Sequence, residues 1–291
     1  MTMRTPLAMI RITAIVAAAF VALGLAAPAF AQEEAIAKQS WSFSGPFGTY
    51  DKKQLQRGFQ VFKEVCSNCH SARLLAFRNL AEEGGPEFTE AQVKALAATY
   101  TIADPDAAGG KRPGIPADRW PGPDQSKADL EASFGVVPPD MSVLAKARSR
   151  EDKFPFWILN YFTAYAEGGP DYIHALLEGY TEAPADAKNP DGTPFKLPDG
   201  KYYNTVFPGH VISMPPPLSD GQVQYAPGPD GKTVPLTVDQ YARDVSAYLM
   251  WMAEPHLDSS HSAGFEVIAF LLLFAGLMYF VKQRVWRNVE H

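Results

Sequence analysis

The stretch Cys66-Ser67-Asn68-Cys69-His70 decides the fold and the chemistry of this 291-residue chain. Cys66 and Cys69 are its only two cysteines, so they have no distant partners with which to build a disulfide framework. A histidine directly after a Cys-x-x-Cys pair is typical of covalent haem attachment, in which both thiols add to the vinyl groups of the porphyrin. The motif therefore predicts one haem c, with His70 as an axial ligand of the iron.

Two other uses of a Cys-x-x-Cys pair fit the surrounding sequence less well. A thioredoxin-like redox pair belongs to a βαβ unit, and no such pattern surrounds Cys66. A zinc site needs two further cysteine or histidine ligands at regular spacing, and none follow the motif. The residues before the motif predict a helix over 52–65 instead, because three apolar residues recur at helical spacing. We expect this stripe to pack the core around the haem: Leu55, Phe59 and Phe62.

The second axial ligand decides what the haem does. A thioether closes the iron and raises its reduction potential, whereas an open position permits peroxidase or gas-sensing chemistry. We predict Met214 as this ligand, because it lies in a loop stiffened by the three prolines 215–217. Met141 and His210 remain as alternatives. The other histidines are expected to pack in the core or lie at the surface: His174, His256 and His261.

Short helices joined by long loops are predicted for the rest of the chain. Residues 101–139 hold seven prolines and five glycines, too many for regular structure, and residues 181–236 show little strand signal. The aromatic stretch 154–166 is expected to form a satellite core, with a partner interface as the alternative. Further helices are predicted over residues 89–100 and 142–148, and another that begins at Pro170 or Asp171 and runs to residue 177.

A last helix before the C-terminal segment is predicted over residues 238–253. It opens with Thr237 and Gln240 in the spacing of a capping box. Its apolar residues lie on one face, so we expect its two methionines to fill the core instead of binding iron: Met250 and Met252.

Both ends of the chain indicate export and membrane anchoring. Residues 1–31 combine a basic start, a short apolar stretch and an Ala-x-Ala site, which is typical of a cleaved signal peptide, with an uncleaved anchor as the alternative. The apolar residues 265–281, with one charge at Glu266, are just long enough to span a bilayer; a buried core helix is the alternative. We expect four parts: a signal peptide at 1–31, a periplasmic haem domain at 32–262, a transmembrane anchor at 263–281 and a cytoplasmic tail at 282–291.

The charge of the C-terminal tail predicts the orientation of the chain in the membrane, and the net charge of the mature chain predicts the class of its partner. The tail is basic, with Lys282, Arg284 and Arg287 against Glu290, so the positive-inside rule puts it in the cytoplasm and the haem domain in the periplasm. Export excludes cytoplasmic enzymes and nucleic-acid binders. Removing the two arginines of the signal peptide from the 26 basic residues leaves 24 against 32 acidic ones, a net charge of −8. Such an acidic surface favours a basic protein partner.

Taken in order, these pieces resemble the cytochrome c1 family, the haem-c subunits of bacterial ubiquinol–cytochrome c reductase (bc1) complexes. The resemblance covers nearly the whole mature chain and implies a mostly α, class I cytochrome-c-like haem domain with long Pro/Gly-rich loops and one C-terminal transmembrane helix. Two departures are Met141, where leucine is commoner, and the lack of the extra cysteine pair of some bacterial relatives. The matching segments are residues 45–48, 57–62, 66–70, 138–142, 146–148, 171–172, 177–180, 214–218, 251–255 and the anchor.

The resemblance also implies roles for individual residues. His70 and Met214 match the axial ligands of the family, and Arg148 matches the arginine that neutralises a haem propionate. Three further residues match positions of the haem pocket: Pro138, Pro139 and Tyr172.

Members of this family carry electrons out of the complex and break no substrate bond themselves. They take one electron from the mobile iron–sulfur head of the Rieske subunit and pass it to a soluble or tethered cytochrome c. Quinol oxidation belongs to the cytochrome b and Rieske subunits, and the complex is dimeric. Two alternatives remain: a membrane-tethered haem-c subunit of a terminal oxidase or free-standing electron shuttle, and a peroxidase or sensor with an open haem.

Overall fold

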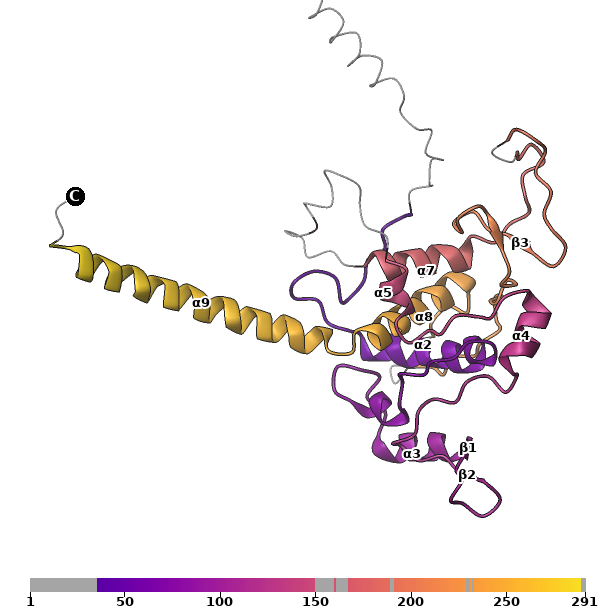
Figure 1. Cartoon of the computed structure of the whole chain (residues 1–291), viewed down its shortest axis with the longest axis horizontal. Helices are drawn as coiled ribbons and strands as arrows, with labels where there is room; N and C mark the ends of the chain where they lie inside the picture. The colour runs from indigo at the N-terminus through magenta and orange to yellow at the C-terminus, as the bar shows by residue number, and fades with distance from the viewer. Residues whose placement is uncertain are drawn as a thin grey trace, which may run out of the picture. The chain divides into compact units, whose positions relative to one another are not determined.

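The computed structural model of the chain describes residues 36–149, 160, 167–188, 191–228, 231 and 233–288. Within these residues it has seven α-helices, two short 3-10 helices and two two-stranded sheets (Figure 1). The mostly helical fold class predicted from the sequence is therefore confirmed. The predicted signal peptide and, apart from residue 160, the aromatic stretch 154–166 lie outside the described residues.

Helices α2 (Lys52–Glu64) and α8 (Val238–Ala253) pack against each other at the centre of the fold. Both present an apolar face to this interface, and burial of such faces is the main source of helix stability in proteins. The stripe predicted on α2 is buried: Leu55, Phe59 and Phe62. The two methionines predicted for the core on α8 are buried as well: Met250 and Met252.

The two central helices approach most closely at Gly58, where a Cβ atom would collide with the backbone carbonyl of Asp244. The Asp244 carboxylate is fully buried and accepts two hydrogen bonds from Arg57, at 2.8 and 2.9 Å, and one from Gln240 at 3.0 Å. The capping box predicted at the start of α8 therefore forms only in part. Thr237 caps the helix, but the Gln240 side chain turns to the buried charge, which is the stronger acceptor.

Helix α7 (Gly168–Glu178) packs against α8, and the short α5 (Leu144–Ala147) lies against both. A Cβ atom at Gly169 would collide with the backbone carbonyl of Ala145, so this glycine allows α7 to approach α5. Helix α7 begins two or three residues before the predicted start at Pro170 or Asp171, because its first turn includes this contact. Helix α5 is shorter than the helix predicted over 142–148, since Ser142 binds another segment.

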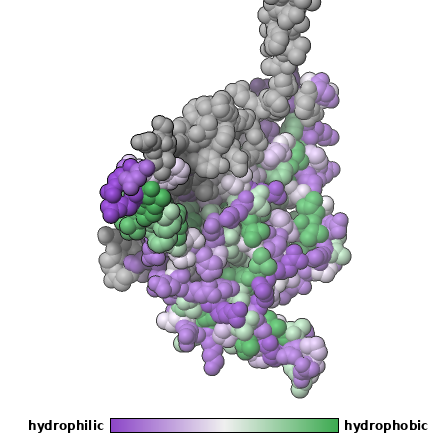
Figure 2. All heavy atoms as spheres, turned by 60° about the vertical axis from the view of Figure 1, so that its left-hand side comes forward, coloured by the Kyte–Doolittle hydropathy of each residue, from purple (hydrophilic) through white to green (hydrophobic). Residues whose placement is uncertain are grey.

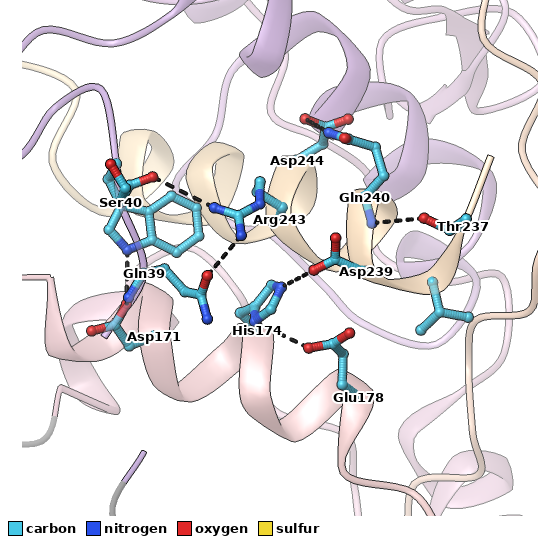
Figure 3. Close-up of polar contacts among 12 residues, drawn as sticks. Gln39, Ser40, Asp171, His174, Glu178, Thr237, Asp239, Gln240, Arg243 and Asp244 are labelled. Atoms are coloured by element: carbon cyan, nitrogen blue, oxygen red, sulfur yellow. Dashed lines mark hydrogen bonds and ion pairs between the residues drawn. The ribbon is translucent and has the colours of Figure 1, made fainter. Parts of the chain in front are cut away.

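The segment before α2 ties α7 to α8 (Figure 3). The nearly buried carboxylate of Asp171, on α7, accepts hydrogen bonds from the Trp41 indole at 2.8 Å and from the Gln39 amide at 2.9 Å. Arg243, on α8, donates to the Gln39 side chain at 2.6 Å and lies 5.7 Å above the Trp41 ring. These contacts connect the segment around Gln39 to two helices that follow it by more than 100 residues in sequence.

The long loop after the motif contains more regular structure than its proline and glycine content predicts. The antiparallel strands β1 (Thr101–Ala103) and β2 (Lys111–Pro113) and the helix α4 (Lys127–Phe134) all lie within residues 101–139, so the prediction of an irregular segment is wrong. No proline or glycine occurs between residues 124 and 134, and Ser126 and Asp129 form a capping box there.

The remaining peripheral helices and strands agree with the predictions made from the sequence. Helix α3 (Glu90–Ala98) begins after the predicted Thr89, which caps it together with Gln92. Strands β3 (Tyr202–Tyr203) and β4 (Val211–Ile212) have two residues each, as expected for a segment with little strand signal.

Helix α9 (Leu257–Trp286) is the one helix among the described residues that is long and apolar enough to cross a membrane. Its large hydrophobic side chains are exposed from Phe265 onward. On the coloured part of the haem-domain surface that faces the viewer in Figure 2, hydrophilic residues predominate and hydrophobic ones form separate patches. Only residues 254–256 separate α9 from α8. This joint is tied down, because Lys146 pairs with the Glu254 carboxylate at 2.7 Å and the Tyr50 hydroxyl donates to the Glu254 carbonyl at 3.2 Å.

Candidate haem-binding site

The cysteine–histidine motif follows α2 directly, in a short 3-10 turn (Cys66–Asn68). The Cys66 carbonyl accepts hydrogen bonds from the backbone N–H groups of Cys69, at 3.2 Å, and His70, at 2.9 Å. The side chains of Ser67 and Asn68 donate to two of the last carbonyls of α2, which have no partner within the helix. The end of α2 therefore places both cysteines and the histidine on one ordered segment.

Both cysteines are free thiols and half-buried. Burial, reinforced by the neighbouring Cys69, raises the pKa of the Cys66 thiol to about 12. A reactive thiol of the thioredoxin type has a lowered pKa instead, so this environment disfavours a redox pair. Within the part of the chain that the structure describes, neither thiol belongs to a cluster of three metal-binding side chains, which disfavours a zinc site.

His70 is nearly buried and has one ring nitrogen fixed by the backbone. Its Nδ1 lies 2.8 Å from the Pro139 carbonyl oxygen. A carbonyl can only accept, so Nδ1 carries the proton and Nε2 keeps its lone pair. Burial also lowers the pKa of the imidazole, which favours the neutral form. A neutral histidine whose second nitrogen is fixed in this way has the form of a metal-binding imidazole.

The carboxylate of Asp140 holds the segment after His70 against the proline turn. It accepts hydrogen bonds from the Ser71 hydroxyl at 2.8 Å, the Arg73 amide at 2.9 Å and the Ser142 amide at 2.9 Å. Burial alone would raise the pKa of Asp140, but the hydrogen bonds from these three residues lower it well below its ordinary value. Because Asp140 stands next to Pro139, these bonds also position the carbonyl that fixes His70.

Asp140 is a site residue that sequence reasoning missed. The spacing of Asp140 and Ser142 is typical of a local turn in which an aspartate accepts from the amide two residues on. The partners at Ser71 and Arg73, however, lie more than 65 residues away in sequence, so no local pattern reveals them.

Met214 is half-buried, and its backbone carbonyl accepts a hydrogen bond from the Tyr180 hydroxyl at 3.1 Å. Burial and, to a lesser extent, the neighbouring Tyr172 raise the pKa of Tyr180. The proline-flanked loop is therefore attached next to the C-terminal end of α7, and the predicted pocket residue Tyr172 is buried in the first half of the same helix. The pairing of Met214 with His70 as axial ligands stays a prediction.

The other predicted site residues differ in how they relate to His70. Pro139 contacts it directly through its carbonyl, and Pro138 precedes it in the same turn. Arg148 is exposed at the end of α5. The two alternatives for the second axial ligand have other roles: Met141 is buried in the core, and His210 is exposed, with its ring stacked on Tyr203 at 5.4 Å.

His174 lies outside this site, between two carboxylates (Figure 3). Its Nε2 is 2.9 Å from Asp239 on α8, and its Nδ1 is 3.4 Å from Glu178 on α7. Both ring nitrogens are therefore engaged by carboxylates, and the side chain is buried, as expected for a packing residue. This histidine connects α7 to α8.

The model of a known protein family matches this chain over residues 41–289 and is described as the cytochrome C1 family. The match includes the cysteine–histidine turn, the proline turn, the Met214 loop and α9. The chain belongs to the cytochrome c1 family. Cytochrome c1 proteins are haem-containing electron-transfer subunits of bc1 complexes, so the predicted class of protein is confirmed and haem c is the implied cofactor.

Curated relatives support the assignment over most of the chain. Cytochrome c1 of Blastochloris viridis is 45% identical over 87% of this chain and 86% of its own length. Cytochrome c1 of Rhodospirillum rubrum is 43% identical over 96% of this chain and 97% of its own length. A protein named cytochrome b/c1, from Bradyrhizobium diazoefficiens, is 50% identical over 85% of this chain, which spans only 35% of that longer relative.

The residues of the turn fit the cofactor of the family. Haem c requires two thiols that are not joined to each other and an imidazole with one nitrogen free for iron. Cys66 and Cys69 are free, and the Pro139 carbonyl leaves Nε2 of His70 unprotonated.

Proposed function

We propose that this chain binds one haem c through thioether bonds from Cys66 and Cys69, with His70 and Met214 as the axial ligands. The observation that carries the proposal is the hydrogen bond between His70 and Pro139, because it prepares the imidazole for iron before any metal is bound. Met214 is the thioether candidate because it is half-buried in a rigid loop attached to α7, whereas Met141, Met250 and Met252 fill the core.

We further propose that Pro138, Pro139 and Tyr172 line the haem pocket and that Arg148 neutralises a propionate. Arg148 is suited to that task because it is exposed at the end of α5, where its guanidinium is free to reach a carboxylate near the protein surface.

The proposed role is the exit step of a bc1 complex. The haem would supply a one-electron iron couple, taking one electron from a Rieske iron–sulfur protein and giving one electron to a basic cytochrome c. The chain's own residues hold and orient the haem and break no substrate bond, so the subunit is not an enzyme by itself. Cytochrome b is proposed as a partner within a dimeric complex, and the relative named cytochrome b/c1 supports this association.

The proposed location is the bacterial inner membrane. Residues 1–31 would be removed as a signal peptide, and the haem domain, residues 32–262, would lie in the periplasm. Residues 263–281 would cross the bilayer and residues 282–291 would lie in the cytoplasm. The support is the exposed apolar surface of α9 and the basic residues that follow it.

A reduced-minus-oxidised visible spectrum tests the proposed role, on protein purified from its native membranes in mild detergent with quinol as the reductant. We expect b-type haem to co-purify and the c-type haem to be reduced by quinol. A c-type signal alone that does not respond to quinol would instead indicate an oxidase subunit or a free-standing shuttle.

A further inference from the structure

The loop of residues 44–48 exposes a phenylalanine beside the start of α9. Phe47 is 78% exposed, more than any large hydrophobic residue of α9 itself. A side chain this exposed, next to a helix that could span a membrane, indicates a surface that is covered in the assembled protein.

The loop is ordered and uncharged, so the exposure of Phe47 is a property of its folded shape. Backbone hydrogen bonds of 3.0 to 3.2 Å close residues 41–49 into a compact turn. Gly45 has a φ of +77°, a conformation that other residues rarely adopt, and a Cβ atom at Gly48 would collide with the backbone of Phe43. Residues 39–50 contain no charged side chain. Such a segment loses no charge solvation on contact with an apolar phase.

The same loop is bound to one face of the first turns of α9. The Tyr50 amide donates to the Asp258 carboxylate at 3.2 Å, and the Gly48 carbonyl lies 2.9 Å from His261 Nδ1. Phe47 then makes an edge contact with Phe265, with ring centroids 6.4 Å apart. Positions 258, 261 and 265 share a helix face, so the loop runs alongside α9 up to the first residue of its apolar segment.

We propose that Phe47 rests in the membrane interface beside the start of α9 and gives the haem domain a second contact with lipid. The interface accommodates aromatic rings at the ends of spanning helices, and Phe47 is level with Phe265, where the exposed apolar surface of α9 begins. We assign lipid as the partner that covers Phe47, because the apolar surface at Phe47 is continuous with that of α9. The proposal rests on α9 spanning the membrane, as proposed above.

Photocrosslinking in the full chain, within its native membrane and complex, tests this contact. Phe47 is replaced by the photoreactive amino acid p-benzoyl-phenylalanine, the membranes are irradiated, and mass spectrometry identifies what is attached at position 47. The same replacement at Leu272, 70% exposed on α9, is the control for the spanning helix. Replacement of Tyr202, an exposed aromatic residue on β3, is the control for a surface in water. Retention of the c-type spectrum verifies that each variant is folded.

The expected result is lipid adducts at positions 47 and 272, severalfold more abundant than at position 202. Adducts with another subunit at position 47 would overturn the proposal and assign the loop to a protein interface. Lipid adducts at 272 together with none at 47 would overturn it as well, while leaving the anchor intact. An absence at 272 of adducts with both lipid and other membrane-spanning subunits would show instead that α9 does not span the membrane, and the proposal would fall with its premise.

Discussion

The Nδ1 atom of His70 and the carbonyl oxygen of Pro139 lie 2.8 Å apart, although 69 residues separate them in sequence. The contact depends on the neighbouring Asp140, whose carboxylate collects hydrogen bonds from Ser71 and Arg73 on one side and from Ser142 on the other. The orientation of the histidine is therefore set by a carboxylate that does not touch it.

Replacing this carboxylate, Asp140→Ala, is expected to lower the free energy of unfolding by about 2–4 kcal/mol, because several hydrogen bonds to a charged acceptor are lost. The measurement is denaturant unfolding of the haem-loaded protein, with the spectrum of the low-spin haem as a second readout of His70. Asp124→Ala removes an exposed carboxylate and should change neither. Equal stability of the two variants would contradict the role given to Asp140.

Met214→Leu is expected to lower the reduction potential of the haem by on the order of 100 mV or more, part of the ~0.8 V range that axial ligands control. The haem should stay attached, because the thioether bonds do not involve this residue, and the reduced protein should bind carbon monoxide. Redox titration and carbon monoxide difference spectra measure the two effects. Met250→Leu, in the core, should keep the potential and resist carbon monoxide. An unaltered potential in Met214→Leu would remove this residue from the proposed ligand set.

The variant Asp244→Ala is expected to cost about 2–3 kcal/mol of stability, because the hydrogen bonds from Arg57 and Gln240 to a buried charged acceptor are lost, while the partly exposed guanidinium of Arg57 can still be solvated. Lys52→Met breaks the exposed Lys52–Glu87 pair and should cost about 1 kcal/mol or less. Thermal unfolding, followed by circular dichroism, measures the loss of stability in the two variants. Similar losses in both variants would mean that the buried pair has no special role in joining α2 to α8.

Gly58→Ala tests the close approach of α2 and α8. The added methyl group would meet the backbone of α8, which cannot turn away as a side chain can, so we expect a loss of about 3 kcal/mol. Gly264→Ala adds the same group on α9, where nothing lies within 4 Å of it, and helix propensity favours alanine there. A neutral Gly58→Ala variant in the same unfolding measurement would show that the helices can separate without cost.

The ion pairs of Arg112 in the β1–β2 hairpin should make the stability of the protein depend on pH in the acidic range. Hydrogen bonds from Arg112 and from the Ile115 amide lower the pKa of Asp118 from 3.8 to about 2. Since the folded-state pKa is depressed, this contribution is complete above about pH 4 and is lost as the pH falls through 2. Unfolding midpoints measured between pH 5 and 2 should therefore fall less steeply in Asp118→Asn than in the wild type. Parallel curves would indicate that this pair contributes nothing.

Sequence patterns predicted those features of the structure that depend only on residues close together in the chain. The haem motif, the buried stripe at Leu55, Phe59 and Phe62, and the cap at Thr89 each follow from a few neighbouring residues. Helix α4 was missed because the proline and glycine content was averaged over residues 101–139, whereas the helix needs only the short stretch from Ser126 to Gly135. The contacts of Asp140 and of Arg57 with Asp244 join segments far apart in the chain, and such pairs leave no periodic signal.

The short joint between α8 and α9 has a mechanical consequence. Only three residues connect the two helices, and Glu254 is held by Lys146 on one side and Tyr50 on the other. A hinge needs backbone that is free to rotate, and this connection has little. A haem bound as proposed would therefore keep its position relative to α9. In that case the proposed electron donor and acceptor would have to move toward the haem domain, because the domain itself could not move toward them.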